Sequence, residues 1–124
     1  MCIRDSSIAD VISSNVIEAT EALKIKYILT PTDSGNTARR ISRFKPDCWI
    51  LAFSRNKDTC SFLPFSYGVH PFFIKNITVG WHDLILDYIK KVSLVKKGDK
   101  VILTQRRFAQ QKGGTDSLGI ITIE

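Results

Sequence analysis

The chain has 124 residues, of which 44% are hydrophobic, and it carries a formal net charge of +6. This length suits one domain with its own hydrophobic core and leaves no room for an additional large substrate domain. The excess of Lys and Arg is modest and spread over several segments, so it indicates a solvated basic surface and does not favour nucleic acid as a partner.

Two classes of protein are disfavoured by simple patterns. No apolar run reaches membrane-spanning length and the N-terminus lacks the apolar core of a signal peptide, so we expect a cytoplasmic protein without a membrane partner. Cys2, Cys48 and Cys60 are widely spaced, and they form no pair at metal-ligand spacing with each other or with His70 and His82. We therefore expect no metal site in this chain.

The N-terminal half alternates helix and strand. Residues 1–6 show no periodic pattern and are expected to be a disordered lead-in, with residues 7–124 forming the domain. Apolar residues at helical spacing then predict an amphipathic helix from Ser7 to about Leu23. The elements expected next are a strand at Tyr27–Leu29, a polar turn at Thr30–Thr37, and a helix at Asn36–Phe44 with Ala38, Ile41 and Phe44 facing inward.

The C-terminal half continues this alternation. The apolar run Trp49–Phe53 is typical of a strand covered by helices on both faces. A short helix at Lys57–Leu63 should end at Pro64, because proline removes a helical donor. The remaining expected elements are a strand at Val69–Ile74, a helix at Trp81–Leu94, a strand at Lys100–Thr104, a polar loop at Gln105–Ser117 and a strand at Leu118–Glu124.

This order of elements predicts an α/β fold. Strands that alternate with helices form a parallel sheet with helices on both faces. The final two strands have no helix between them and should run antiparallel, which makes the five-stranded sheet mixed. Ligands of such open sheets bind at the carboxyl ends of the strands.

The turn Thr30–Thr37 is the best candidate for a binding site on this pattern. It joins a strand to a helix start, where unpaired backbone N–H groups and the helix dipole favour an anion. Ser34 and Thr37 can donate hydroxyl hydrogen bonds, and Gly35 permits a ligand to approach the backbone. The same residue types also cap helices, so a purely structural turn is an equally good interpretation at this point.

Other polar and aromatic residues carry two interpretations each. Asp33 could sense a ligand's charge or cap the helix, and Trp81 could stack on a base or sugar or pack in the core. Arg106 and Arg107 follow a strand and are candidates to contact an anion. The arginines on the second helix are typical of a solvated face, and no nucleophile or metal partner is evident for His70 or His82.

Several motifs occur together in a consistent order. They are Thr32-x-Ser34-Gly35-x-Thr37-Ala38-Arg39, Phe44-Lys45-Pro46, Ile50-Leu51-Ala52 with Arg55-Asn56, Gly68-Val69, and Lys97-Gly98-Asp99-x-Val101. From about Ser7 to Ile123 the chain resembles the C-terminal domain of the pyruvate kinase family. The resemblance implies a three-layer α/β/α sandwich around a five-stranded mixed sheet whose last strand is antiparallel.

The resemblance also implies that catalysis and regulation lie on different domains. In this family phosphoryl transfer from phosphoenolpyruvate to ADP occurs on a separate barrel domain with magnesium and potassium, so no cofactor is expected here. The C-terminal domain supplies a subunit interface and, in many members, an allosteric site for sugar phosphates or nucleotides. Carried over to this chain, the effector site comprises Thr32, Asp33, Ser34, Gly35, Asn36, Thr37, Trp81, Arg106, Arg107, Gly113, Gly114 and Thr115.

The chain departs from the family pattern at two positions that bear on the effector. Asp33 stands where members that bind a sugar bisphosphate often have a basic or neutral residue, and Tyr88 stands where some have an arginine. A carboxylate opposes a nearby phosphate by about 1 kcal/mol or more. We therefore expect a monophosphate, an inorganic anion or a nucleotide.

Two functions from different classes follow from these observations. The first is the regulatory and assembly domain of a pyruvate kinase, with the barrel domain as its partner. The second is a free-standing small-ligand or anion-binding module. In either case Leu118–Ile123 is expected at a sheet edge, where it would pair with its copy in a homo-oligomer, and Ile121→Pro is expected to weaken that pairing.

Overall fold

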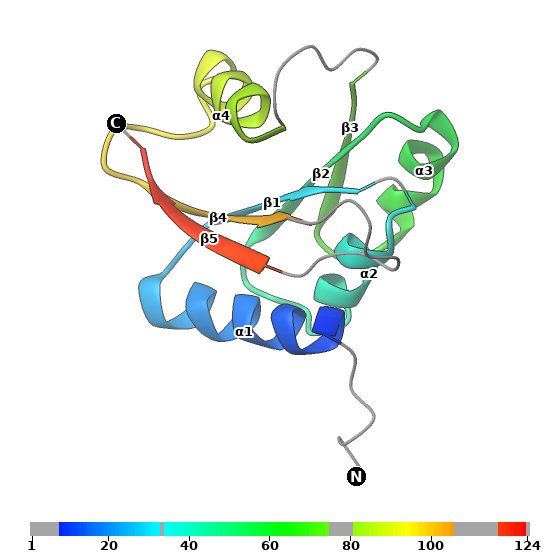
Figure 1. Ribbon diagram of the computed structural model, residues 1–124, viewed down its shortest axis with the longest axis horizontal. Helices are drawn as coiled ribbons and strands as arrows, with labels where there is room; N and C mark the ends of the chain where they lie inside the picture. Colours follow the sequence, from blue (N-terminus) through cyan, green and yellow to red (C-terminus); the bar gives the residue numbers. More distant parts are fainter. Residues whose placement is uncertain (1–7, 33, 75–80, 106–116, 124) are drawn as a thin grey trace, which may run out of the picture.

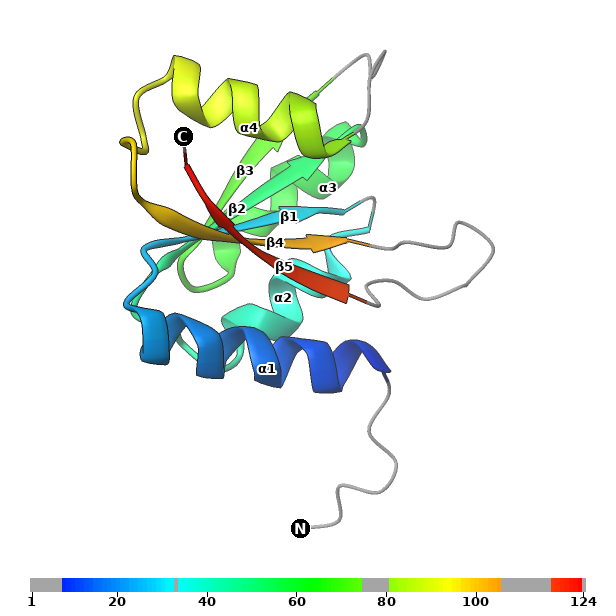
Figure 2. The ribbon, with the colours of Figure 1, turned by 60° about the vertical axis from the view of Figure 1, so that its left-hand side comes forward.

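The computed structural model describes residues 8–32, 34–74, 81–105 and 117–123. One five-stranded sheet lies between helix α4 on one face and helices α1 and α2 on the other, as Figures 1 and 2 show. The elements in chain order are α1 (Ile8–Leu23), β1 (Tyr27–Pro31), α2 (Asn36–Ser42), β2 (Trp49–Ser54), α3 (Lys57–Phe62), the 3₁₀ helix η1 (Leu63–Phe65), β3 (Val69–Phe73), α4 (Trp81–Lys91), β4 (Lys100–Gln105) and β5 (Ser117–Thr122).

The sheet has the order β3-β2-β1-β4-β5. Strands β1 to β4 run parallel, and β5 pairs antiparallel with β4 from Lys100↔Thr122 to Gln105↔Ser117. The expected mixed sheet and three-layer arrangement are confirmed. An antiparallel partner needs no helical crossover, which is why the missing helix between the last two strands could predict their relative direction.

Alternate residues of the central strands form two separate cores. Side chains along a strand point to opposite faces in turn. Ile28, Ile50 and Ile102 therefore pack with residues of α1 and α2, including Val16 and Ile41. On the other face Leu29, Leu51, Phe53, Val101 and Leu103 pack with Ile85 and Ile89 of α4.

Two aromatic residues that were expected to be inside, Phe44 and Trp49, are exposed. Helix α2 ends at Ser42, so Phe44 lies beyond the helix and is 52% exposed. Trp49 is 57% exposed because it opens β2 at the end of the sheet and not in its covered middle. His70 lies on the edge strand β3, where its ring stacks edge-on against Phe72 at 5.0 Å but remains exposed.

Helix α1 is less buried than its pattern suggested. It contacts the sheet and α2 through its middle, where Val16 is fully buried. Ile8, Val11 and Leu23, which were expected on its buried face, are 62%, 49% and 42% exposed. The apolar stripe of this helix is longer than the surface that the sheet offers to it.

The predicted boundaries hold within a few residues. Pro64 ends α3 as expected, and the chain continues for one turn as η1. Helix α4 ends at Lys91, three residues earlier than expected, because Ser93 takes a left-handed φ of 61°. The expected lead-in at residues 1–6 and most of the loop 105–117 lie outside the described residues.

Candidate functional site

The sheet reverses its strand order beside β1. From β1 the chain passes through α2 to β2 and then through α3 to β3, whereas α4 carries it back to β4 on the other side of β1. The carboxyl ends of β1 and β4 therefore flank a topological switch point, the usual ligand position in open α/β sheets. Figure 2 shows these two strand ends side by side. The turn Thr30–Thr37 begins there.

A buried hydroxyl pair joins the two strands at the switch point. Thr104 of β4 donates its hydroxyl to Thr30 Oγ1 of β1 at 2.7 Å, and both residues are completely buried. A buried hydroxyl without a partner is costly, so this bond favours one relative position of the two strand ends. The sequence analysis did not single out this pair, although a threonine at the end of each apolar strand was a readable signal.

The turn after β1 is held by hydrogen bonds of its own. The Gly35 N–H donates to Thr32 Oγ1 at 2.8 Å, and the Asn36 N–H donates to Ser34 Oγ at 3.3 Å. These two N–H groups were expected to face an anion, and in this structure they are satisfied inside the turn. The hydroxyls of Thr32 and Ser34 accept these bonds, and each hydroxyl still has its own proton to donate.

Gly35 has a conformational role in the turn. It takes a left-handed φ of 86° at the N-cap of α2, a region that residues with a Cβ rarely adopt. A Cβ added here would lie 3.0 Å from Leu63, 3.2 Å from Thr59 and 3.3 Å from Phe62. A side chain at position 35 would therefore point into α3 and η1.

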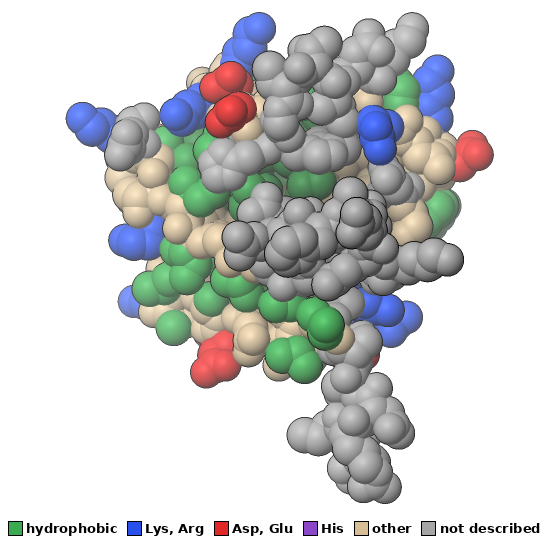
Figure 3. Space-filling view, viewed as in Figure 1, with side chains coloured by type: hydrophobic (Ala, Val, Ile, Leu, Met, Phe, Trp, Pro, Cys, Tyr) green, Lys and Arg blue, Asp and Glu red, His purple; other side chains and the backbone are tan. Residues whose placement is uncertain are grey.

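The arginines of α2 have contacts within the domain. Arg39 donates to Asn36 Oδ1 at 2.6 Å, and its guanidinium lies 5.3 Å from the centre of the Phe62 ring. Arg40 Nε lies 3.5 Å from Asp10 Oδ1 of α1. On the face shown in Figure 3, the Lys and Arg side chains lie at separate places and not in one continuous patch. Both observations favour a solvated basic surface over a nucleic-acid interface.

The structure brings together five of the predicted site residues and leaves the others outside its description. Thr32, Ser34, Gly35, Asn36 and Thr37 form one turn and helix start at the switch point, with Thr32 and Thr37 buried and Ser34 and Asn36 exposed. Trp81 begins α4, but its side chain is outside the described part. The residues that lie wholly outside it are Asp33, Arg106, Arg107, Gly113, Gly114 and Thr115.

Two kinds of site are absent from the part of the chain that the structure describes. In residues 8–32, 34–74, 81–105 and 117–123, no three His, Cys, Asp or Glu side chains gather so that they could hold a metal ion. Within the same ranges, no helix is both long enough and apolar enough to cross a bilayer.

Cys48 has the environment of an unreactive thiol. Its pKa is raised to about 11, chiefly because burial disfavours the thiolate. A hydrogen bond with Thr20 lowers the pKa and the charge of Asp47 raises it, both by less than burial does. The thiolate is the reactive form of cysteine, so Cys48 is a poor candidate for a nucleophile.

We expect Cys48 to react with iodoacetamide at pH 8 about 100-fold more slowly in the folded chain than in the unfolded chain, since two pKa units reduce the thiolate fraction by that factor. Peptide mass spectrometry with and without guanidinium measures the two rates. The raised pKa also makes the free energy of unfolding depend on pH, because the unfolded chain loses the thiol proton at a lower pH than the folded chain does. The contribution of Cys48 to stability is complete below its ordinary pKa of 9.0 and is lost as the pH rises toward 11. Equal alkylation rates in the folded and unfolded chains would contradict the conclusion that Cys48 is unreactive in the folded domain.

Comparison with known proteins gives one consistent result. The family described as the pyruvate kinase alpha/beta domain matches residues 10–121. A pyruvate kinase from Thermococcus litoralis is 45% identical over 118 residues, which cover 95% of this chain and 24% of that protein. A pyruvate kinase from Dictyostelium discoideum is 32% identical over 120 residues, covering 94% of this chain and 24% of that protein.

The fold shows the same similarity. A solved structure of a pyruvate kinase from Cryptosporidium parvum superposes with a TM-score of 0.82 at 23% identity, over 98% of this chain and 24% of that one. At this identity the match supports the fold alone. The chain thus spans about a quarter of the length of the relatives that it matches.

Proposed function

The chain belongs to the pyruvate kinase alpha/beta domain family, and from that premise we propose that it serves as the regulatory and subunit-assembly domain of a pyruvate kinase. The complete enzyme would convert phosphoenolpyruvate and ADP to pyruvate and ATP in glycolysis. The observation that carries the proposal is the 45% identity with the Thermococcus litoralis enzyme across 95% of this chain. Residues 7–124 would form the domain, and residues 1–6 would precede it.

The chemistry of the complete enzyme would lie outside this chain. Phosphoryl transfer needs metal ions and positioned cations to neutralise the charge that develops on the transferred group. We assign the magnesium and potassium to the barrel domain, which the chain would join as a partner. The chain by itself should be inactive.

We propose that the turn Thr32–Thr37 holds the phosphate group of an effector. Its position at the switch point, the helix start that follows it, and the hydroxyl protons of Thr32 and Ser34 all support this role. Arg106 and Arg107, which follow β4, and Trp81, which begins α4, would complete the site from the neighbouring elements. A sugar monophosphate, a nucleotide or inorganic phosphate fits this set of donors.

Asp33→Lys should strengthen the binding of ribose 5-phosphate by up to about tenfold, equivalent to roughly 1.4 kcal/mol. The physical reason is that a carboxylate beside the phosphate is replaced by a cation. Ser34→Ala should weaken binding, because it removes a hydroxyl donor from an exposed position in the turn. Titration calorimetry at low salt with phosphate, ribose 5-phosphate and AMP measures all three proteins.

Asp47→Lys is the matched control for this experiment. It changes the net charge by the same amount, but Asp47 precedes β2 at the opposite end of the sheet from the turn. Its effect on binding should be small and should vanish at moderate salt. Equal binding in the millimolar range or weaker by every variant would mean that Thr32–Thr37 is only a helix cap.

A further inference from the structure

The backbone pairing of β1 reaches further on one side than on the other. Its pairing with β2 continues to Pro31↔Phe53, whereas its pairing with β4 ends at Leu29↔Leu103. The last two residues of β1 are therefore paired through the backbone with β2 alone. This asymmetry lies at the switch point, where the turn Thr32–Thr37 begins.

Pro31 accounts for the shorter pairing with β4. The Thr32 N–H donates to the Phe53 carbonyl at 2.9 Å, toward β2. Successive N–H groups of a strand point to alternate sides, so residue 31 faces β4. Because proline has no N–H, β1 has no backbone donor to offer β4 at this position.

The Thr30–Thr104 hydroxyl pair joins the two strands where the backbone does not. Thr30 and Thr104 directly follow Leu29 and Leu103, the last backbone pair. Their hydroxyl bond of 2.7 Å lies inside the domain, where both residues are completely buried. The bond thus fixes the separation of β1 and β4 one residue before Pro31.

This hydroxyl pair contributes geometry more than stability. Two valines have nearly the shape of two threonines, and replacing both partners of a buried hydrogen bond by apolar groups is nearly neutral for the free energy of unfolding. A hydroxyl bond requires a short distance between the oxygens and a favourable angle, whereas apolar contacts tolerate a range of separations. A buried polar pair therefore specifies one arrangement of the strand ends.

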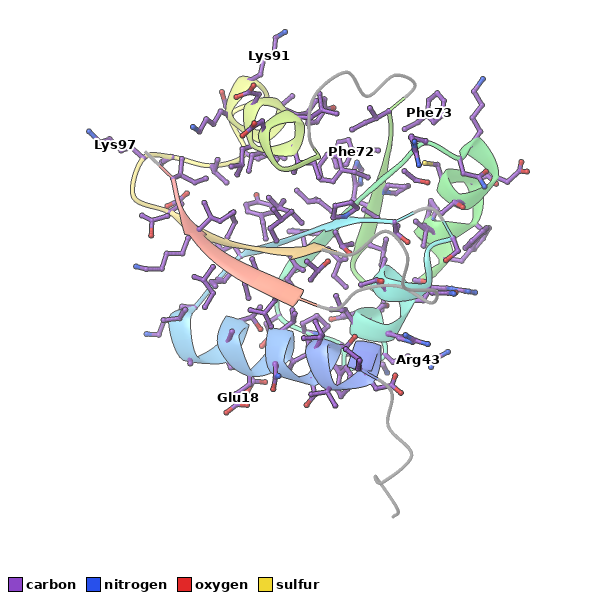
Figure 4. The ribbon with its side chains drawn as sticks, in the orientation of Figure 1. Glu18, Arg43, Phe72, Phe73, Lys91 and Lys97 are labelled. Carbon is purple, nitrogen blue, oxygen red and sulfur yellow. The ribbon has the colours of Figure 1, made fainter. Side chains whose placement is uncertain are left out.

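The other side of β1 is anchored through Phe53. Its ring is fully buried and stacks against Phe72 at 5.0 Å, and Figure 4 shows Phe72 on the side of β3 that faces α4. The Phe53 carbonyl holds the Thr32 N–H, and Thr32 Oγ1 in turn accepts from the Gly35 N–H at 2.8 Å. The chain therefore enters the turn held on both sides, by Phe53 of β2 and by Thr104 of β4.

We propose that Thr30 and Thr104 are positioning residues for the effector. Their bond holds the turn Thr32–Thr37 at a fixed separation from the end of β4, after which Arg106 and Arg107 follow in the sequence. The two strand ends then need no adjustment when an effector binds, which lowers the cost of binding. This inference rests on the proposed function, and it adds two buried residues that act on the effector only through the turn.

Titration calorimetry with ribose 5-phosphate and urea unfolding, both on variants of the 124-residue chain, test the proposal. Thr30→Val and Thr104→Val should each weaken binding at least about fivefold, because each breaks the bond that fixes the strand ends. The variant with both valines should unfold at nearly the same urea concentration as the native chain, yet bind as weakly as the single variants. Thr104→Ser keeps the hydroxyl and should bind within about twofold of the native chain.

Thr20→Val is the matched control. Thr20 is a buried threonine of α1 whose hydroxyl donates to the Ile17 carbonyl at 2.7 Å. Its own carbonyl accepts from the Ile25 N–H, just before β1 starts, so it lies at the opposite end of the sheet from the turn. This variant should lose stability as Thr104→Val does, but its affinity for ribose 5-phosphate should stay within about twofold of the native value.

The outcomes separate this inference from the proposed function. If the native chain binds ribose 5-phosphate and the variant with both valines binds it equally well, the positioning role is overturned and the proposed effector site stands. If affinity falls in proportion to stability in every variant, including Thr20→Val, the hydroxyl pair is purely structural and the proposal is also overturned. If the native chain binds neither ribose 5-phosphate nor inorganic phosphate, the effector site and the positioning role both fall.

Discussion

Gly35→Ala should lower the free energy of unfolding by about 2–5 kcal/mol. About 1–2 kcal/mol would come from forcing a residue with a Cβ into the left-handed region. A further 1–3 kcal/mol, roughly, would come from overpacking, because the new methyl group would meet Leu63 at 3.0 Å and Thr59 at 3.2 Å. Urea unfolding followed by circular dichroism measures the loss.

Gly98→Ala separates these two costs. Gly98 has a similar φ of 94°, but nothing lies within 4 Å of the position that its Cβ would take. Its alanine variant should lose only the backbone cost of about 1–2 kcal/mol. An equal decrease in the free energy of unfolding in the two variants would show that the close packing of Gly35 against α3 and η1 does not contribute to stability.

The second large effect is expected at the edge strand β5. The Ile123 N–H donates to the Asp99 carbonyl at 2.7 Å, toward β4. Successive N–H groups of a strand point to alternate sides, so the Ile121 N–H also faces β4, while those of Ile120 and Thr122 face the open edge. Ile121→Pro, the substitution suggested by the sequence, would therefore damage the β4–β5 pairing and not the dimer alone.

Ile120→Pro is the sharper test of assembly through β5. It removes a donor that faces the open edge, and we expect it to raise the dimer dissociation constant at least about tenfold, equivalent to roughly 1.4 kcal/mol. Ile120→Thr keeps the N–H and most β propensity, so it controls for the loss of the half-exposed side chain. Analytical ultracentrifugation measures both constants. A native chain that stays monomeric at every accessible concentration would contradict assembly through this strand.

The order and type of the elements could be predicted because their signals are local. Pro64 ended its helix as expected, and the missing helix before the last strand indicated an antiparallel pair. The exposure of Phe44 and Trp49 could not be predicted in this way, since it depends on where α2 stops and how far the helical layers reach over the sheet. A continuous apolar run does not show which of its residues lies at the strand's open end.

The candidate site was predicted in position but not in detail. The turn Thr32–Thr37 lies at the switch point, as its place after the first strand suggested. The direction of the Gly35 Cβ and the Thr30–Thr104 hydroxyl pair depend on packing between segments far apart in the sequence. Composition and spacing contain no information on such contacts.

The most direct measurement of the central claim is the pyruvate kinase activity of a fusion in which this chain replaces the matching quarter of the Thermococcus litoralis enzyme. The two proteins are 45% identical over 95% of this chain, so the transplanted domain should fit the host barrel. We predict that the fusion forms pyruvate from phosphoenolpyruvate and ADP, whereas the 124-residue chain alone forms none. An inactive fusion that folds, or pyruvate formation by the isolated chain, would contradict the assignment of this chain as the regulatory and assembly domain of a pyruvate kinase.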